Sequence, residues 1–586
     1  MARPIAGSPP SRGARGGGSA RGGTPPPTRG GGRPLVGGGP GPISGANLLV
    51  LLVSLAGVGL LVGAAVFASG APGATQGPGS SPGASGAAAA SEAPGSSGAA
   101  PSGGSASPDA GATPATPAGS AQLALALVAD VDDLRVGLTV AKLAAEIEAG
   151  RVAVPCGVSA LALAGDPVAV DPAACAKTSD IVTAVRKTKS SLGLLPPALV
   201  SPRVKALRVG GADLFGSPSI RAKAYPLVAT VNSPPTAWTS FDPAEVRTII
   251  STGDTCPDRG VSHQANTLGK GWDWTLDGGT AKYTGTRMDR RFDGPDGNGW
   301  PVVDAVRTGN EGAVRTLISD AEVTLNDFEC PMTSKFRQHD TGTIFSIDPK
   351  VAPFLAGAGV DVVTLASNHM TDQGVAALKE TLALFDENGI ERFGAGMNLA
   401  EALKPAVLDV RGVRFAFVGF NEIPGSARAD ASTPGVVYLD EANVRKGIAA
   451  ARKVADVVIV VPQWGWPEYH ANFTARQKQQ MKLFWDAGAD HVIGHGTHWA
   501  GPVSITKDDS GFHFVVGSHG NFLFGQDWSR QTQEAVIVEA TFVGSRLAQA
   551  RLHPFIMLDQ AQANLTSPTS DGKYVLTQVW SNSILK

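Results

Sequence analysis

GVDVVTLASNHMTDQGVAALKETLALFDENG, residues 359–389, joins a strand-forming run to a helix-forming run. The first part, Val362 to Leu365, is rich in the β-branched residues that favour buried strands. The second part, from residue 374, repeats apolar residues at helical spacing. Between them lie an amide and an imidazole, Asn368 and His369. This order predicts a strand that ends in polar side chains and is followed by a helix.

The same order recurs further along the chain. ADVVIVVPQWG precedes TARQKQQMKLFWDAGA, and DHVIGHGTH follows that helical pattern. Strands that alternate with helices of this length indicate crossover connections and a largely central sheet. We therefore expect an α/β domain over residues 278–557, with the polar residues at its strand ends converging on one edge of the sheet.

Four of these strand ends carry candidate ligands or catalytic groups. They are Glu329 in NDFECP, Asn368 with His369 in SNH, Gln463 with Glu468 in QWGWPEY, and His495 with His498 in GHGTH. Carboxylate, amide oxygen and imidazole are the groups that bind Zn, Mn or Fe in proteins. The alternative is that these are ordinary core or loop residues, because the same region contains several other histidines.

The motif order Glu-Cys-Pro, Ser-Asn-His with Asp-x-Gly, Trp-Gly-x-x-Glu-Tyr, Gly-His-x-x-His and Gly-Asn-Phe resembles the CapA family of poly-γ-glutamate capsule proteins. That family is similar to calcineurin-like metallophosphoesterases, so the resemblance implies a four-layer αββα sandwich. It also implies one divalent metal, Mn, Zn or Fe, and His369 as a proton donor. The implied metal ligands are Glu329, Asn368, His495 and His498, and the implied substrate-binding residues are Arg291, Glu468, Tyr469 and Asn521.

Two positions depart from the family pattern as the motifs align. The family has Asp after Thr-Gly and Arg five residues later, and we align this motif with YTGTRMDRR, which retains Arg291 but has Thr286 in place of the Asp. The family's His-Trp-Gly becomes Gln463-Trp464-Gly465. Because charge and donor strength both fall at such a site, the departures weaken the case for a two-metal cluster and for hydrolysis. The alternative is that Asp289 or Asp327 supplies the missing carboxylate.

The N-terminal part of the chain has a different character. Residues 1–42 contain six arginines without lysine or acid and indicate a disordered basic tail. Residues 43–69 include an uncharged apolar run long enough for one transmembrane helix, and residues 70–120 are a Gly/Ala/Ser/Pro-rich linker. The arginines predict a cytoplasmic N-terminus and extracytoplasmic domains in a single-pass membrane protein. A cleaved signal peptide is the alternative, and it exports the same domains.

The remaining segments carry weaker signals. Residues 121–277 predict a smaller α/β or α+β domain, similar to a solute-binding lobe, in which Asp254 and the tryptophans near residue 273 mark either a ligand groove or ordinary packing. Residues 558–586 are expected to form a C-terminal extension. Of the four cysteines we favour a Cys156–Cys175 disulfide, with four buried thiols as the alternative. With 49 basic and 51 acidic residues, bulk charge does not favour nucleic acid as a partner.

The sequence leaves three functions open. The first is a membrane-anchored CapA-like protein that assists synthesis, export or retention of an anionic capsule polymer, with the polymer or its synthase as partner. The second is a metal-dependent phosphoesterase or other hydrolase. The third is a protein that binds polymer or solute at a degenerate metal site without turnover.

Overall fold

The strand expected within the opening stretch is β15, Val362–Thr364, a short strand whose three residues are buried. We describe the computed structural model for residues 119–586; the predicted tail, transmembrane helix and nearly all of the linker lie outside these residues. The helix that follows β15 is α9, Gly374–Glu387. Its buried side chains, such as Leu378, Leu382 and Phe385, recur at the helical spacing that the sequence predicts.

The largest sheet has ten strands in the order β13-β12-β28-β27-β26-β11-β14-β15-β16, with β25 paired to β11. The bounds are β11 Val246–Cys256, β12 Thr280–Asp289, β13 Trp300–Thr308, β14 Val323–Phe328, β16 Glu391–Phe393, β25 Asn521–Phe524, β26 Glu534–Val543, β27 Arg546–Leu558 and β28 Gln562–Leu565. Strands β11, β14, β15 and β16 run parallel to one another. Their carboxyl ends therefore lie at one edge of the sheet.

A second sheet has seven strands in the order β18-β19-β21-β22-β24-β23-β29. The bounds are β18 Ala406–Val410, β19 Val413–Asn421, β21 Val457–Gln463, β22 His491–Ile493, β23 Val503–Asp508, β24 Gly511–Val516 and β29 Ile584–Leu585. Its central strands β19, β21, β22 and β24 are parallel.

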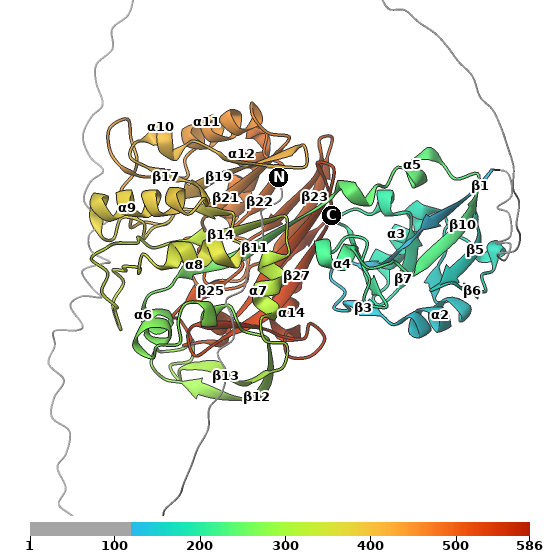
Figure 1. Cartoon of the computed structure of the whole chain (residues 1–586), viewed down its shortest axis with the longest axis horizontal. Helices are drawn as coiled ribbons and strands as arrows, with labels where there is room; N and C mark the ends of the chain where they lie inside the picture. The colour runs from blue at the N-terminus through green and yellow to red at the C-terminus, as the bar shows by residue number, and fades with distance from the viewer. Residues whose placement is uncertain (1–118) are drawn as a thin grey trace, which may run out of the picture. The chain divides into compact units, whose positions relative to one another are not determined.

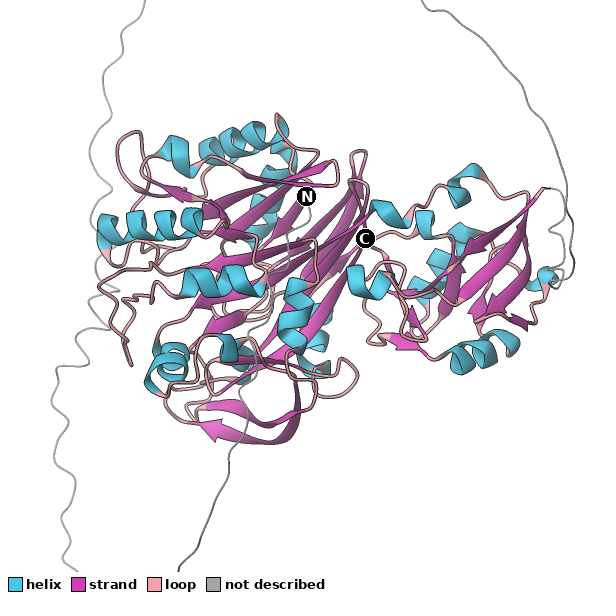
Figure 2. Cartoon of the chain, in the orientation of Figure 1, coloured by secondary structure: helices cyan, strands magenta, loops and turns pink. Residues whose placement is uncertain are grey.

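Helices cover the outer face of each sheet, which completes four layers (Figures 1 and 2). One apolar core, with Leu325, Phe417 and Ile459 among its members, draws residues from both sheets and lies between them. A second core packs the large sheet against α8, Val351–Ala358, and α9, and a third packs the seven-stranded sheet against α11, Glu441–Arg452, and α12, Ala475–Ala487. The layered α/β fold is therefore the one expected.

Helix α12 shows how local sequence sets an element's ends. Thr474 caps it by accepting a hydrogen bond from the backbone of Gln477, whose side chain bonds back to the cap residue. Gly488, with φ +98°, ends the helix in the left-handed conformation that glycine adopts without steric cost. The remaining α-helices of the domain are α6 Arg259–Ser262, α7 Ala313–Ser319, α10 Leu399–Ala402, α13 Arg530–Gln533 and α14 Lys573–Ser581.

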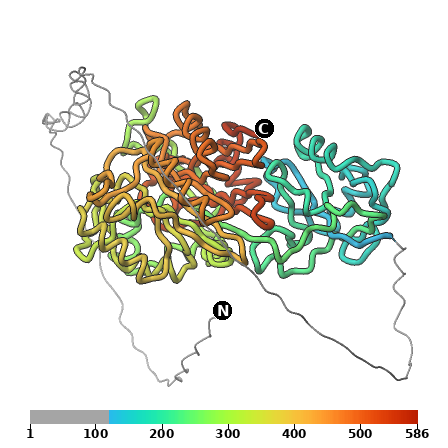
Figure 3. Tube along the Cα trace, turned by 90° about the horizontal axis from the view of Figure 1, so that it is seen from above, coloured from blue at the N-terminus to red at the C-terminus, as the bar shows by residue number. Residues whose placement is uncertain are grey.

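Two boundaries differ from the prediction. Strand β11, which was assigned to the smaller domain, lies in the middle of the large sheet between β14 and β26, so the large domain begins at Val246 and not at residue 278. Residues 558–586 are not an extension beyond the fold, because β28 pairs with β27 and β29 pairs with β23. Figure 3 shows this last segment, in red, packed within the body of the domain.

Residues before β11 form a smaller lobe with two four-stranded sheets, β1-β10-β5-β6 and β4-β7-β2-β8. The bounds are β1 Ser120–Ala124, β2 Ala126–Asp130, β4 Val152–Ala153, β5 Val158–Leu163, β6 Asp166–Val168, β7 Leu192–Leu195, β8 Val204–Ala206, β10 Leu227–Asn232, α2 Val140–Glu148 and α3 Thr178–Lys187. A disulfide joins Cys156 to Cys175, the favoured pair, and a second joins Cys256 to Cys330. Among residues 119–586, no helix has both the length and the apolar character needed to cross a membrane.

Candidate metal centre

The strand ends bring together a buried cluster of carboxylates and imidazoles. Asp254 is near the end of β11, Asp327 is in β14, and Glu329 follows β14 directly. His495 and His498 lie on the loop after β22 in the facing sheet. All five side chains are almost completely buried. The convergence predicted from strand ends is therefore present, although it involves both sheets.

These five residues form two overlapping sets of potential metal ligands. Asp254, Asp327 and His495 have ligand atoms within 4.8 Å of one another, and so do Asp254, Glu329 and His498. Asp254 is common to both sets. Its two carboxylate oxygens face different imidazoles: Oδ1 is 3.5 Å from Nδ1 of His495, and Oδ2 is 3.2 Å from Nδ1 of His498.

The loop GHGTH holds its two histidines by an unusual backbone path. Gly496 has φ +95°, and its backbone N–H approaches Oδ1 of Asp254 at 3.3 Å. His498 itself has φ +57°, a left-handed conformation that is uncommon for residues other than glycine and often occurs at functional sites. Asn521, at the start of β25, contacts Nδ1 of His498 through Oδ1 at 2.9 Å. Asn521, which was predicted to bind substrate, therefore positions a candidate ligand.

The cluster contains three carboxyls and two imidazoles, so a bound cation would offset the negative charge of its carboxylates. Burial opposes ionisation of Asp254, but His495 and His498 outweigh it and lower the pKa of this carboxyl. Burial raises the pKa of Asp327 to about 7, and burial with the charges of Asp254 and Asp327 raises the pKa of Glu329 well above its ordinary value. Two of the three carboxyls therefore resist ionisation until a cation is near.

Unsatisfied polar atoms support the same interpretation. Within the described chain, both oxygens of Asp327 and both ring nitrogens of His495 lack a hydrogen-bond partner. Glu329 is similar, since neither of its oxygens makes a well-formed hydrogen bond. The Gln463 side chain offsets only part of the rise in pKa that burial causes at Glu329. Buried polar atoms normally have partners. This donor set of oxygen and imidazole nitrogen fits a divalent Mn, Zn or Fe ion.

Asn368 and Gln463 complete the inner edge of the cluster. Nε2 of Gln463 donates to Oδ1 of Asn368 at 3.4 Å, and Gln463 pairs through its backbone with His495. Asn368 is thus close to the cluster, and its role as a ligand stays a prediction. Gln463 therefore places a neutral amide at this edge of the cluster.

His369, the predicted proton donor, lies beside the cluster and outside both ligand sets. Its Nδ1 is 2.9 Å from Oδ2 of Asp372, and its ring packs edge-on against Phe345. Asp372 belongs to the Asp-x-Gly part of the motif. A carboxylate that holds one ring nitrogen orients the other for proton transfer.

The motif alignment at Thr286 is wrong. Thr286 is exposed on β12, whereas Asp254, which follows the earlier Thr-Gly pair in STGDTCPDR and has Arg259 five residues later, lies in the buried cluster. Arg291, which was predicted to bind substrate, pairs instead with Asp289 and Asp527. The Arg259 guanidinium lies 4.6 Å from the ring of Phe345, which contacts His369.

The loop after β21 contributes the other two predicted substrate-binding residues. Tyr469 stacks on His498 with ring centroids 5.3 Å apart and contacts Trp528. Glu468 is near enough for its charge to raise the pKa of His498, against the effect of burial. Both residues therefore border the cluster, and both were found from sequence. Asp254 was predicted only as a possible ligand-groove residue of the smaller domain, and Asp327 only as a possible replacement for a missing carboxylate, whereas Arg259 was missed. Asp327 is two positions before Glu329 and so on the same face of its strand.

Fold and site together define a layered α/β protein with a buried carboxylate and imidazole centre. Residues 248–526 match the family model described as bacterial capsule synthesis protein PGA_cap, which is the similarity that the motif order predicted. The chain is 31% identical over 228 residues to the PGA biosynthesis protein CapA of Bacillus subtilis, which covers 38% of this chain and 59% of that protein. It is 30% identical over 233 residues to the capsule biosynthesis protein CapA of Bacillus anthracis, covering 38% and 56%. The chain therefore spans less than two thirds of either relative.

Solved structures give weaker matches. The calcineurin-like phosphoesterase YfkN from Bacillus subtilis aligns with a TM-score of 0.27 and 13% identity, covering 57% of this chain and 97% of that one. A putative 5'-nucleotidase from Staphylococcus aureus aligns with a TM-score of 0.29 and 10% identity, covering 57% and 58%. Scores this low do not establish a common fold or activity.

Proposed function

We propose that this protein is a metal-dependent hydrolase of the CapA type that acts in making, exporting or retaining an anionic capsule polymer such as poly-γ-glutamate. The observation that carries the proposal is the sharing of Asp254 between two buried carboxylate and imidazole sets, beside a histidine oriented by a carboxylate. The match of residues 248–526 to the capsule synthesis family model supports the capsule role.

The proposed ligands are Asp254, Asp327, Glu329, His495 and His498, with the amide of Asn368 beside them. A bound divalent ion would polarise a substrate oxygen and lower the pKa of a coordinated water. His369, whose Nδ1 Asp372 holds, offers Nε2 to protonate a leaving oxygen. Arg259 and Tyr469 border this site and are the candidates for contacting an anionic substrate.

We further propose that the folded domains act outside the cytoplasm, attached by the apolar segment within residues 43–69. Two disulfides in the described chain suit an oxidising compartment, where such bonds persist. Loss of membrane attachment after deletion of residues 43–69 is the expected result, checked by fractionation. Recovery of the deleted form with the membrane would contradict this part of the proposal.

A binding protein without turnover is the second candidate. The observation that favours it is Gln463, a neutral amide at a position where the family has histidine. Such a protein would bind polymer and metal but hydrolyse nothing. Thermal stabilisation by poly-γ-glutamate without any hydrolysis would favour this candidate.

The test combines metal content with turnover in full-length protein. Wild type and the Asp254→Asn variant are loaded with Mn or Zn, analysed for bound metal, and assayed with bis-p-nitrophenyl phosphate and γ-glutamyl p-nitroanilide. Asp304→Asn is the matched control, since Asp304 is half exposed on β13. We expect stoichiometric metal and turnover in wild type and control, and loss of both in Asp254→Asn. Full metal binding by Asp254→Asn would refute the proposed site. Metal without turnover in wild type would favour the binding protein.

A further inference from the structure

The Cys256–Cys330 disulfide joins the two strands that carry the carboxylates of the metal centre. Cys256 is two residues after Asp254 at the end of β11, and Cys330 directly follows Glu329 after β14. The strands are parallel neighbours, with Asp254 opposite Asp327 and Thr255 opposite Phe328. The last main-chain bond between them runs from the N–H of Glu329 to the carbonyl of Thr255, 2.9 Å long. The disulfide thus lies directly beyond the point where the main-chain pairing of β11 and β14 ends.

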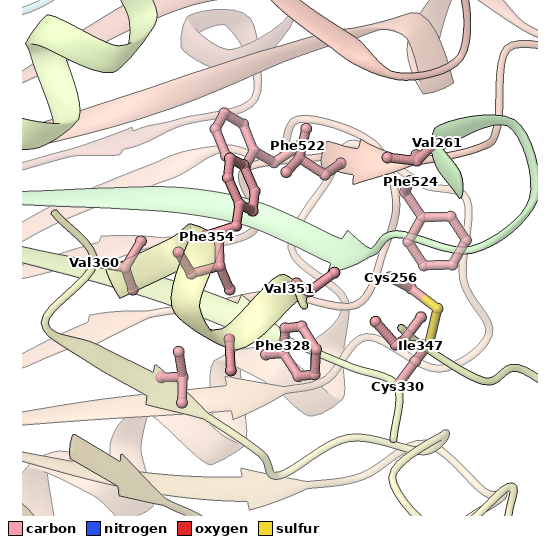
Figure 4. Close-up of a cluster of buried hydrophobic side chains, with 14 of the residues drawn as sticks. Cys256, Val261, Phe328, Cys330, Ile347, Val351, Phe354, Val360, Phe522 and Phe524 are labelled. Atoms are coloured by element: carbon pink, nitrogen blue, oxygen red, sulfur yellow. A yellow bond between two sulfur atoms is a disulfide. The ribbon is translucent and has the colours of Figure 1, made fainter. Parts of the chain in front are cut away.

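The surroundings of the disulfide are apolar. Both cysteines are buried, and Figure 4 shows them among Phe328, Ile347 and Phe524. Side chains alternate along the end of β14 and the two residues after it, so Asp327 and Glu329 face the ligand cluster while Phe328 and Cys330 face the apolar core. The cross-link therefore lies on the opposite side of this strand from the ligands.

The ligands on that strand pair lie where the main-chain pairing ends. Asp254 and Asp327 are directly opposed on neighbouring strands, and Glu329 is the first residue after β14. Asp254 belongs to one ligand set with Asp327 and to the other with Glu329, and in each set the ligand atoms lie within 4.8 Å of one another. Without a restraint beyond the last main-chain bond, the strand ends are free to separate by local fraying. Separation would lengthen the distances on which both ligand sets depend.

We propose that the Cys256–Cys330 disulfide is a positioning element of the metal centre, so that the oxidised chain binds metal tightly and the reduced chain does not. The inference rests on the proposed metal site and goes beyond it by making metal loading depend on oxidation. A chain that is still reduced would leave the centre incomplete. The protein would then acquire its metal only in an oxidising compartment.

The chain offers a matched control in its other disulfide. Cys156 and Cys175 are 19 residues apart in the smaller lobe, whereas Cys256 and Cys330 are 74 residues apart. Two double variants are compared with wild type in full-length protein: Cys256→Ala with Cys330→Ala, and Cys156→Ala with Cys175→Ala. The probe is Mn²⁺, because thiolates prefer softer metals and free cysteines will not imitate the site. Affinity is measured by calorimetry well below each variant's melting temperature.

We expect Mn²⁺ to bind the Cys256/Cys330 variant roughly 10- to 100-fold more weakly than wild type, the range typical when groups that orient metal ligands are lost. The Cys156/Cys175 variant should bind like wild type. A disulfide with only a stabilising role would lower the melting temperature and leave the affinity unchanged, and that result would overturn the inference. If wild type binds no Mn²⁺ or other divalent metal, the proposed function fails first, and the inference fails with it.

A second measurement covers the case in which the Cys256/Cys330 variant does not fold. Folded, Mn-loaded wild type is treated with a phosphine reductant until mass spectrometry shows Cys256 and Cys330 reduced, and Mn²⁺ release to a chelator is timed. The Cys156/Cys175 variant is treated in parallel. Release that accelerates in both supports the inference, and release that is unchanged after confirmed reduction overturns it.

Discussion

Replacing Glu329 with glutamine should stabilise the metal-free protein while removing its response to metal. Glu329 is almost completely buried, its oxygens make no well-formed hydrogen bond among the described residues, and Asp254 and Asp327 are close. Glutamine has nearly the same shape and no charge. The substitution therefore removes the electrostatic cost of the site and one of its ligands together.

The size of the effect follows from the burial of the carboxyl. An unsatisfied buried group costs about 1–3 kcal/mol when it is neutral and more when it is charged, so replacing the carboxyl by an equally unsatisfied amide should make metal-free Glu329→Gln more stable than wild type by about 1 kcal/mol or more. Metal at a hundredfold excess over its dissociation constant stabilises a one-site protein by about 2.7 kcal/mol. Wild type should show that gain, and Glu329→Gln should show much less of it. Adding metal should therefore reduce or reverse the difference in unfolding free energy between Glu329→Gln and wild type.

The pH dependence provides a second signature. Burial and neighbouring carboxylates raise the pKa of Glu329 above its ordinary value of 4.5. An acidic group whose pKa is higher in the folded than in the unfolded protein stabilises the folded state below pH 4.5. This contribution is lost as the pH rises through the pKa of the group in the folded protein. The advantage of glutamine in metal-free protein should therefore be small near pH 4.5 and grow towards neutral pH.

The assay is urea unfolding of metal-free and Mn-loaded full-length protein at pH 5 and pH 7.5. Glu539→Gln is the matched control: Glu539 is equally buried, but His553 and Arg551 pair with it and hold its pKa at about 2. Replacing Glu539 with glutamine should therefore lower the stability of the protein, because it leaves buried basic partners without their carboxylate. A metal-free Glu329→Gln protein that is less stable than wild type at pH 7.5 would refute the reasoning.

Three further predictions concern single residues. His369→Ala should keep stoichiometric metal but lose about 10²- to 10⁴-fold in turnover, and Asp372→Asn should lose less turnover. Elemental analysis and a hydrolysis assay check both variants. Loss of metal in His369→Ala would contradict the role of His369 as a proton donor outside the ligand sets. Burial lowers the pKa of His491 to about 4, so wild type should lose up to about 3 kcal/mol as the pH falls from 6.5 to 4, and urea unfolding of His491→Gln should lack this loss. Trp464→Phe removes a buried donor to the carbonyl of Gly517 and should cost about 1–3 kcal/mol in urea unfolding; a neutral result would contradict that bond's contribution.

Much of the site could be predicted because its residues follow recognisable strands. His495 and His498 come directly after a buried strand, and Asn368 and His369 follow another, so their type and position were readable locally. Glu329 was identified in the same way. Parallel strands of one sheet end at one edge, which made convergence a sound expectation.

Asp254 shows where local reading was insufficient. The pair Thr-Gly occurs at residues 252–253 and again at 284–285, and only the first is followed by Asp with Arg five residues later. The motif was aligned with the second pair because β11 was assigned to the smaller lobe. Its neighbours in the sheet, β14 and β26, are distant in sequence, and pairing with them is what makes Asp254 part of the site.

The sequence by itself determined the alternation of strands and helices, the residue types at four strand ends and the similarity of the large domain to the capsule synthesis family. Only the tertiary structure decided which acids join the histidines, that Arg291 is occupied by Asp289 and Asp527, and that Cys256 bonds to Cys330. The physical reason is the sequence separation between the residues that interact. Burial period, caps and turns are set by neighbours along the chain, whereas a metal centre depends on strand order and on the packing of two sheets, which residues far apart in sequence decide together.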